Sequence, residues 1–390
     1  MDFDFKSSDG RDEIVKSKYY KTIFILFLAL LLNAGYLAAA SSSSLFYYLN
    51  ILLHIGLGIT LIVPLFTKVR YYIKTEMLLG KTFGETAGRL GYFLMKVAFI
   101  TGLYLLIVGN VKTERNALYL HAFAGFFASM CLISSIRRAA YNISVENTYW
   151  LAGRWGLTVF IIAGIVPIFS MMIRSTYQDE TAFISNKGII PSTLAEANDQ
   201  GEESPFYPSP AETTNKSAIR TDFLREPQSC SRTGCHVDIA QQFKDSGHSR
   251  SALATPWYQE TLSYAQNQYG KEAGRFCAAC HTPALLFEGH AAKSVDALQK
   301  MPAGYSAFSC NACHTIQSVK NTLGNGAYKI EKPVLSSLST THNAIFNKLH
   351  DFLIYADPDP HRGLLLRPFL RDQTGAFCSS CHKLTLESPI

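Results

Sequence analysis

Three copies of the motif Cys-x-x-Cys-His define the chemistry expected of the second half of the chain. They are Cys277-Ala-Ala-Cys280-His281, Cys310-Asn-Ala-Cys313-His314 and Cys378-Ser-Ser-Cys381-His382. A random chain of this composition would hold roughly 0.006 such motifs, so three copies are not accidental. Two thiols at this spacing bond to the two vinyl groups of haem, and the adjacent imidazole coordinates its iron. Zinc sites and disulfides also use paired cysteines, but neither needs His directly after the second Cys. We therefore predict three covalent haem c groups.

A fourth motif is wider than the other three. In Cys230-Ser-Arg-Thr-Gly-Cys235-His236, four residues separate the thiols instead of two. A local disulfide or a pair of zinc ligands is the alternative interpretation. We predict a fourth haem c here, which accounts for eight of the nine cysteines. Cys131 remains, and we expect it to be a small buried residue of an apolar helix.

The context of the wide motif resembles a known family. The run from Cys230 to His248 is similar to the opening haem motif of the cytochrome c554 family, in which an aromatic residue, a Ser or Thr and then a His follow the first motif. The three further motifs, which end in Cys378-Ser-Ser-Cys-His-Lys, resemble the tetrahaem core of that family. The resemblance covers roughly residues 225–390 and implies a haem-packed domain with His248 as an axial ligand. The widened first motif departs from the family pattern.

Sixth ligands for four irons must come from the remaining histidines of this half. The candidates are His248, His290, His342, His350 and His361. A solvated surface His is the alternative for each of them. His361 lies in a Pro- and Gly-containing turn shortly before the fourth motif, which resembles the placement of ligands in multihaem cytochromes. Their assignment to individual irons is left open, because such ligands often come from remote chain segments.

The elements expected to carry these residues are short helices. We predict helices at Val237–Ser246, Trp257–Tyr269 and Thr341–Phe352, which wrap around the haems of a tetrahaem domain at residues 229–390. Four haems in about 160 residues leave little room for a hydrophobic core, so the cofactors themselves should act as the core. Residues 176–228 are rich in Pro, Ser, Thr, Asn and Glu, which predicts an extended, solvated extracytoplasmic linker.

The first half of the chain has the composition of a membrane domain. The whole chain is 48% hydrophobic and only 17% charged, which is too apolar for a typical soluble protein. Apolar stretches long enough to cross a bilayer, about 20 residues each, lie at Thr22–Ala40, Leu45–Phe66, Tyr92–Val111, Ala117–Ile136 and Trp155–Ile173. We therefore predict an all-α bundle of about five transmembrane helices at residues 22–175.

The distribution of basic residues predicts the orientation of these helices. Thirteen Lys and Arg residues fall in segments 1–21, 67–91 and 137–154, whereas the opposite short loops hold only Lys112 and Arg115. Short cytoplasmic loops retain basic residues, so residues 1–21 should be cytoplasmic and the haem half periplasmic, on the bacterial inner membrane. The first apolar segment also resembles a signal peptide. Its removal would leave four helices and the same orientation of the haem half.

Two histidines lie inside the apolar stretches. His54 and His121 are each followed by Gly four residues on, at Gly58 and Gly125, and such a glycine leaves room for a flat macrocycle beside the ligand. The depths of the two histidines agree if the fourth helix begins near Val111. We predict one non-covalent haem b between them, and histidines of a helix core or of a quinone pocket are the alternative. The layout weakly resembles that of small membrane cytochromes b.

These patterns together predict the class of function. Residues 1–175 carry 17 Lys and Arg against 9 Asp and Glu, while the polar half has no excess of basic residues, which excludes a nucleic-acid binder. We expect respiratory electron transfer between the quinone/quinol pool and an extracytoplasmic redox protein or complex, which is a quinol:cytochrome oxidoreductase type of activity. The alternatives are a multihaem enzyme acting on a small nitrogen or sulfur compound, and a purely structural membrane anchor for a cytochrome.

Overall fold

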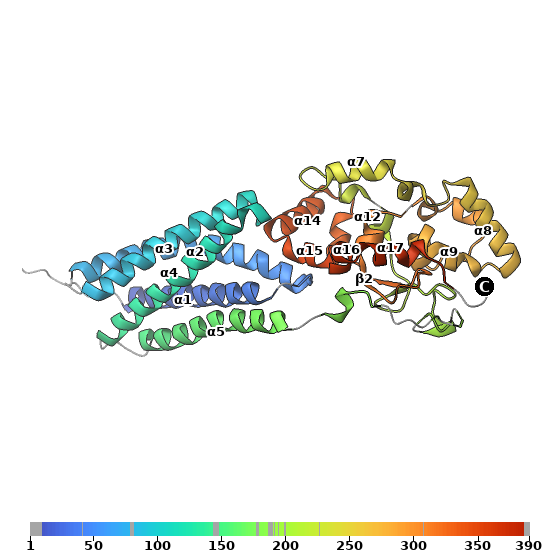
Figure 1. Cartoon of the computed structure of the whole chain (residues 1–390). Coiled ribbons are helices and arrows are strands. Elements are labelled where there is room, and N and C mark those ends of the chain that lie inside the picture. The colour runs from blue at the N-terminus through green and yellow to red at the C-terminus, as the bar shows by residue number, and fades with distance from the viewer. Residues whose placement is uncertain are drawn as a thin grey trace, which may run out of the picture. The chain divides into compact units, whose positions relative to one another are not determined.

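The computed structural model consists of two compact units (Figure 1). It describes residues 10–385, except 41, 79–81, 143–147, 177–178, 186–189, 191, 194, 199, 226 and 307. The first unit comprises residues 1–177 together with 353–358. The second comprises residues 178–352 together with 359–390.

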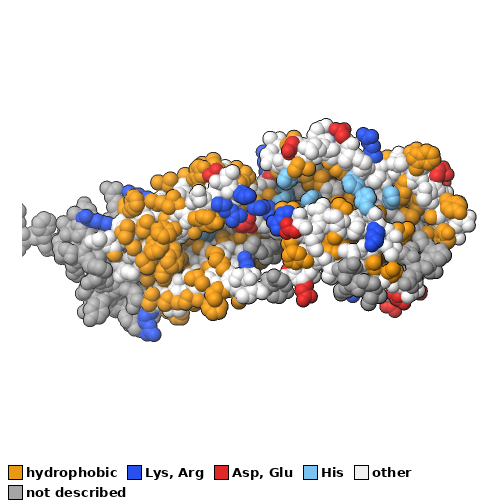
Figure 2. All heavy atoms as spheres, viewed as in Figure 1, with side chains coloured by type: hydrophobic (Ala, Val, Ile, Leu, Met, Phe, Trp, Pro, Cys, Tyr) orange, Lys and Arg blue, Asp and Glu red, His pale blue; other side chains and the backbone are white. Residues whose placement is uncertain are grey.

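The first unit is a bundle of long apolar helices. Its helices are α1 (Gly10–Ala39), α2 (Leu45–Leu78), α3 (Thr82–Val108), α4 (Arg115–Asn142) and α5 (Thr148–Thr176). Among the described residues, five helical segments are long and apolar enough to cross a membrane: Lys21–Ala39, Leu45–Thr67, Thr86–Val108, Lys112–Ser135 and Arg154–Thr176. Each overlaps one of the five predicted stretches, so the prediction of five apolar spans is confirmed. Many large hydrophobic side chains of this unit are exposed, and hydrophobic side chains are spread over its visible face (Figure 2), which indicates a membrane-embedded protein.

Small residues allow the helices of the bundle to approach closely. A Cβ atom added to Gly35 of α1 would lie 2.8 Å from the Cα atom of Ala163 on α5. One added to Gly91 of α3 would lie 2.9 Å from Cβ of Cys131 on α4, and Cys131 is buried, as predicted. Small residues at such interfaces are typical of helix packing within membranes. The fourth span begins at Lys112 with the 3-10 turn η1 (Lys112–Glu114), earlier than the predicted Ala117 and close to Val111, the start at which the depths of His54 and His121 would agree.

The second unit combines short helices with a small sheet. The strands β1 (Glu212–Thr213), β2 (Ile316–Val319) and β3 (Tyr328–Ile330) are ordered β1-β3-β2, with β1 parallel and β2 antiparallel to β3. Ile316 of β2 pairs with Ile330 of β3. The described helices are α6 (Asp222–Arg225), α7 (Val237–Asp245), α8 (Pro256–Tyr269), α9 (Ala273–His281), α10 (Pro283–Phe287), α11 (Val295–Gln299), α12 (Cys310–His314), α13 (Ser336–Ser339), α14 (Ala344–Ala356, of which 353–356 belong to the first unit), α15 (Asp359–Leu365), α16 (Pro368–Asp372) and α17 (Thr374–His382).

This unit has a hydrophobic core of its own, which differs from the expectation that cofactors alone would form it. Phe206, Phe287 and Tyr328 are completely buried, and the rings of Phe206 and Phe287 pack edge to face with centroids 5.3 Å apart. The Tyr328 hydroxyl donates a hydrogen bond to the carbonyl of Ala279 at 2.6 Å. That bond ties β3 to helix α9, which carries the second motif.

The segment predicted to be a solvated linker is built into this core instead. Phe206 and Phe223 are buried, and β1 within the segment pairs with β3. Glu212 of β1 is completely buried with Lys320 Nζ 3.2 Å and Lys329 Nζ 3.7 Å from its carboxylate. The prediction missed this because the segment is anchored by isolated apolar residues in irregular structure, which leave no hydrophobic periodicity in the sequence.

The three predicted helices of this half are present, with shifted ends. Helix α7 ends one residue early, because the side chain of Ser246 accepts a hydrogen bond from the N–H of Ser249 and starts a 3-10 turn, η5 (Gly247–Arg250). Helix α8 begins with Pro256 in its first turn. Helix α14 begins at Ala344, because Asn343 Oδ1 accepts a hydrogen bond from the N–H of Ile345 at 2.9 Å.

Candidate functional site

The three narrow motifs each form the last turn of a helix. Helices α9, α12 and α17 all end at the His of a Cys-x-x-Cys-His motif. Residues three apart on an α-helix lie on the same face, so both thiols of each motif are on one side. The N–H of the fifth residue faces the carbonyl of the first, which closes each motif into a compact turn with the His beside the thiols.

The wide motif keeps the same closure despite its extra residues. The N–H of His236 donates to the carbonyl of Cys230 at 2.9 Å, which joins the first Cys to the His as in a helical motif. The additional length forms a tight turn, in which the N–H of Cys235 donates to the carbonyl of Arg232 at 2.9 Å. Gly234 has φ +87°, a conformation that favours glycine. The two extra residues therefore loop out, and the geometry of the wide motif fits the same chemistry that is predicted for the three Cys-x-x-Cys-His motifs.

The cysteine thiols of different motifs lie next to one another. All nine cysteines are described and none forms a disulfide. A hydrogen bond with the Cys381 thiol, together with burial, raises the pKa of Cys280, and the Cys310 thiol and burial have the same effect on the pKa of Cys230. Among the described residues, no three His, Cys, Asp or Glu side chains are grouped as a metal ion would need.

Two motif histidines are held in the tautomer that can bind a metal. Nδ1 of His281 is 3.0 Å from the carbonyl oxygen of Ser251, and Nδ1 of His314 is 2.6 Å from that of Leu365. A carbonyl oxygen only accepts, so Nδ1 must carry the proton and donate. Nε2 then keeps its lone pair, which is the arrangement usual for histidines that coordinate metals.

His248 and His382 come together from distant parts of the chain. Their ring centroids are 5.9 Å apart and their planes make an angle of 62°. Two imidazoles on opposite sides of one metal, each about 2 Å from it, would have centroids about 6 Å apart. The structure therefore places His248, the candidate sixth ligand with family-like context, at the fourth motif.

His350 and His361 lie near the first and third motifs. Burial, together with the nearby His350, His236 and His314, lowers the pKa of His361 to about 4. Burial also lowers the pKa of His350. Both imidazoles are therefore neutral at pH 7, as an iron ligand must be.

The remaining two candidates differ in their exposure. His342 is exposed between α13 and α14, and His290 is half-buried after α10. The ring beside His281 is that of Tyr258, stacked at 4.5 Å with an interplanar angle of 18°. Among the described residues, His248 therefore lies near the histidine of the fourth motif, and His361 lies near those of the first and third motifs.

The two membrane histidines face each other in the same way. The ring centroids of His54 and His121 are 6.1 Å apart, with an interplanar angle of 79°. Nδ1 of His54 lies 3.2 Å from Asn33 Oδ1, and Nδ1 of His121 lies 2.7 Å from the carbonyl oxygen of Ala98. Asn33 in turn donates to Asn50 Oδ1 at 2.7 Å. Both Nδ1 atoms are thus turned outward, which leaves the Nε2 atoms for a shared metal.

The glycines near these histidines have two different roles. Gly102 of α3 contacts the ring of His121, since an added Cβ would lie 2.8 Å from its Cε1 atom. A Cβ added at Gly58 or Gly125 would meet nothing within 4 Å. The predicted glycines thus leave free space one turn from each histidine, and space of this kind is what a macrocycle requires.

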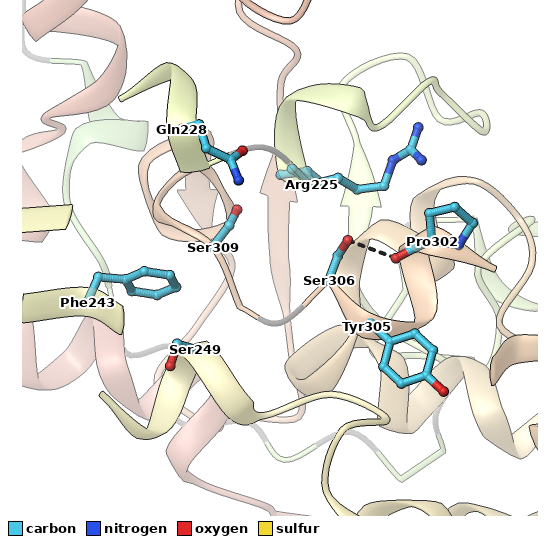
Figure 3. A pocket seen from close by; sticks show the side chains of 9 residues that line it. Arg225, Gln228, Phe243, Ser249, Pro302, Tyr305, Ser306 and Ser309 are labelled. Atoms are coloured by element: carbon cyan, nitrogen blue, oxygen red, sulfur yellow. Dashed lines mark hydrogen bonds between the residues drawn. The ribbon is translucent and has the colours of Figure 1, made fainter. Parts of the chain in front are cut away.

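A cavity of about 260 Å³ opens beside the third motif (Figure 3). Phe243 extends its ring toward it, and Ser249 and Ser309 line it next to His248 and Cys310. Ser309 Oγ is buried and has no hydrogen-bond partner among the described residues. A polar group of a bound molecule would satisfy it, so the surroundings of this motif fit a cofactor. On the visible face of the second unit, histidine side chains gather in a row (Figure 2).

Sequence reasoning missed several residues that support these histidines. Asn33 is an amide within an apolar stretch, and this rare polarity was the available signal. Arg232 and Asp351 were also missed. Arg232 is the only charged residue between two paired thiols in any of the four motifs. The supporting carbonyls of Ala98, Ser251 and Leu365 have no signal in the sequence, because every residue has a carbonyl.

A comparison with protein-family models found no matching family, and comparisons with curated proteins and with solved structures found no match.

Proposed function

We propose that the chain is a membrane-anchored multihaem cytochrome, which transfers electrons between the quinone/quinol pool and an extracytoplasmic redox protein. The pairing of His248 with His382 carries this proposal, because two remote imidazoles stand at the separation that one iron requires. The pair His54 and His121 repeats the relationship in the membrane unit. Four Cys/His motifs would hold haem c, and the membrane pair would hold one haem b. When bound, these groups supply reversible one-electron chemistry.

The arrangement of the motifs supports a role in conduction. Cys230 of the first motif neighbours Cys310 of the third, and Cys280 of the second neighbours Cys381 of the fourth. Cys381 also lies close enough to Cys313 of the third motif to help burial raise the pKa of Cys313 to about 12. The motifs therefore follow one another in the order first, third, fourth, second. Groups attached in this order would form a continuous chain with the first and second motifs at its ends.

The membrane unit would supply the quinol-side contact. Basic residues predict that α2 and α4 both run from the periplasm to the cytoplasm, which places His54 and His121 in the outer half of the bilayer. Quinol oxidised there would release both protons outside, and the electrons would remain on the same side of the inner membrane. Turnover would then be electroneutral, since no charge crosses the bilayer.

Two measurements on the purified protein test the proposal. Pyridine haemochrome analysis counts haem c and haem b separately, and we expect four and one. Reconstitution in lipid vesicles with quinol, a soluble acceptor and a voltage-sensitive dye should show acceptor reduction without a membrane potential. A potential that grows with turnover would contradict the outer-half geometry. Absence of haem b and of any quinone reaction would instead favour a structural anchor.

A second candidate function follows from the second motif. His248 and His361 lie near histidines of the other three motifs, whereas the ring stacked on His281 of the second motif is that of Tyr258. An iron held by His281 with an open sixth position could bind a small nitrogen or sulfur compound and oxidise or reduce it. A spectrum of the protein with one high-spin haem c that binds such a ligand would favour this enzyme, whereas four low-spin haems would exclude it.

A further inference from the structure

The extra residues of the wide motif place a charged side chain that the narrow motifs lack. The residue pairs between the thiols of the narrow motifs are Ala-Ala, Asn-Ala and Ser-Ser. In the wide motif, Arg232 begins the looped-out turn, and the bond from the His236 N–H to the Cys230 carbonyl closes the motif without it. The attachment geometry therefore does not require Arg232, which leaves its side chain available for another purpose.

The Arg232 guanidinium forms an ion pair with Asp351 of helix α14. Its Nε lies 2.9 Å from Asp351 Oδ2, and its Nη2 lies 2.5 Å from Oδ1, so the ion pair is bidentate. Its Nη1 donates to the carbonyl of Ser339 at 3.1 Å. Arg232 and Asp351 are partly shielded from solvent, with side chains 23% and 36% exposed. A pair of this geometry fixes both partners better than a single exposed contact does.

The same carboxylate holds His350, the neighbouring residue. Asp351 Oδ1 lies 2.9 Å from Nδ1 of His350, and Arg232 Nη2 lies 3.0 Å from that nitrogen. Two tautomers are possible in principle, since Nδ1 could donate to Asp351 or accept from Arg232. The guanidinium already donates to the Asp351 carboxylate and to the Ser339 carbonyl, which are better acceptors than an imidazole nitrogen. Nδ1 of His350 therefore carries the proton and donates it to Asp351. Nε2 of His350 then keeps its lone pair.

We propose that Arg232 is a positioning residue, which acts through Asp351 to set the tautomer and the donor strength of His350 as a sixth ligand near the first and third motifs. This inference rests on the proposed function. A carboxylate that accepts the outer N–H of a ligating histidine raises the basicity of the ligand. The wide motif thus connects one attachment site directly to the ligand of an iron.

Redox titration of the full-length protein, with each haem c resolved by its spectrum, tests the proposal. Asp351→Asn removes negative charge behind His350, which weakens its donation to the oxidised iron and should raise the potential of one haem. Arg232→Gln leaves the carboxylate without its counter-charge and should lower the potential of the same haem. We expect each to change the oxidised-to-reduced ratio of that haem roughly tenfold at fixed potential, about 59 mV for one electron. Arg232→Lys should shift the potential of this haem less than Arg232→Gln does.

Two further variants separate this effect from loss of structure. Arg371→Gln removes the same charge from an exposed ion pair with Asp372 and should shift no haem. Deletion of Arg232 and Thr233 restores the two-residue spacing, and should retain four covalent haems while shifting the same haem as Arg232→Gln. Mass spectrometry counts the haems of each variant before titration.

The outcomes distinguish failure of the proposed function from failure of the positioning role of Arg232. Fewer than three covalent haems in the parent protein would remove the proposed function itself. Four covalent haems with no shift in Arg232→Gln and Asp351→Asn, or shifts of the same sign, would overturn the positioning role alone. Loss of low-spin character in one haem of His350→Ala supports ligation by His350, and an unchanged low-spin spectrum in that variant contradicts it.

Discussion

His248 and His382 lie with their ring centroids 5.9 Å apart, although one belongs to a 3-10 turn after the first motif and the other ends the fourth. Neither residue lies near the other in the sequence. Their meeting indicates that the second unit folds by bringing the beginning and the end of the motif series together.

Replacement of His248 should change one haem c and leave the others intact. His248→Ala removes the candidate sixth ligand at the fourth motif, so we expect one haem to change from low spin to high spin in the electron paramagnetic resonance spectrum. His342→Ala is the matched control, because the side chain of His342 is exposed. An unchanged spectrum in His248→Ala would show that the two rings do not share an iron.

Loss of the thiols of the wide motif should remove one covalent haem. In Cys230→Ser/Cys235→Ser, His236 remains but cannot form a covalent attachment, so the mass of the purified chain should fall by one haem. The corresponding double variant of Cys277 and Cys280 should cause the same loss. If the Cys230/Cys235 variant carries as many covalent haems as the parent, the wide motif carries no haem c.

The two membrane histidines should act as one site. His54→Ala and His121→Ala should each remove the same non-covalent haem b, because neither imidazole alone supports stable low-spin coordination. The covalent haems should be unaffected, which the pyridine haemochrome spectrum measures at separate wavelengths. Retention of haem b in either variant would assign these histidines to a helix core or a quinone pocket.

Bulk at Gly125 should exclude this haem without unfolding the bundle. A Cβ added at Gly125 meets nothing within 4 Å, so the protein itself tolerates a larger residue there. A bound macrocycle would occupy that space, and Gly125→Leu should therefore lower the haem b content. Gly56→Leu is the control, since Gly56 is equally open but lies only two residues from His54, off its helix face. Equal haem b loss in both variants would argue against a specific cradle.

The buried hydroxyl of Tyr328 should stabilise the second unit. Tyr328→Phe removes its hydrogen bond to the Ala279 carbonyl and leaves that buried acceptor unpaired, which costs about 1–3 kcal/mol. We expect a lower midpoint for thermal unfolding of this unit. Tyr264→Phe changes a side chain that is 64% exposed and should leave the midpoint unchanged. Equal midpoints for Tyr328→Phe and the parent would show that the bond contributes nothing.

Patterns in the sequence predicted the elements whose formation depends on residues that are near one another in the chain. The five apolar spans are confirmed because length and composition alone decide whether a helix can cross a membrane, and His54 and His121 could be singled out because an ionisable residue is rare there. The three helices of the second half were predicted from short-range pattern, and their ends moved where caps such as Asn343 intervene.

Features that depend on distant contacts could not be predicted. The residues around Phe206 are buried because they pack against Phe287 and because β1 pairs with β3. No hydrophobic periodicity in the sequence indicates either contact. Likewise, the association of His248 with the fourth motif and of Asp351 with Arg232 is fixed by tertiary folding. The widened spacing of the first motif can be read from the sequence, but the contact between Arg232 of that motif and Asp351 on α14 cannot.

The proximity of Cys280 to Cys381, and of Cys230 to Cys310, bears on how such a chain could be assembled in a cell. Neighbouring thiols in an oxidising compartment readily form disulfides. A single bond between these motifs would consume one thiol from each and block attachment at both. Biogenesis outside the cytoplasm would therefore require a reductant that protects the cysteines, and haem ligation before the second unit closes around them.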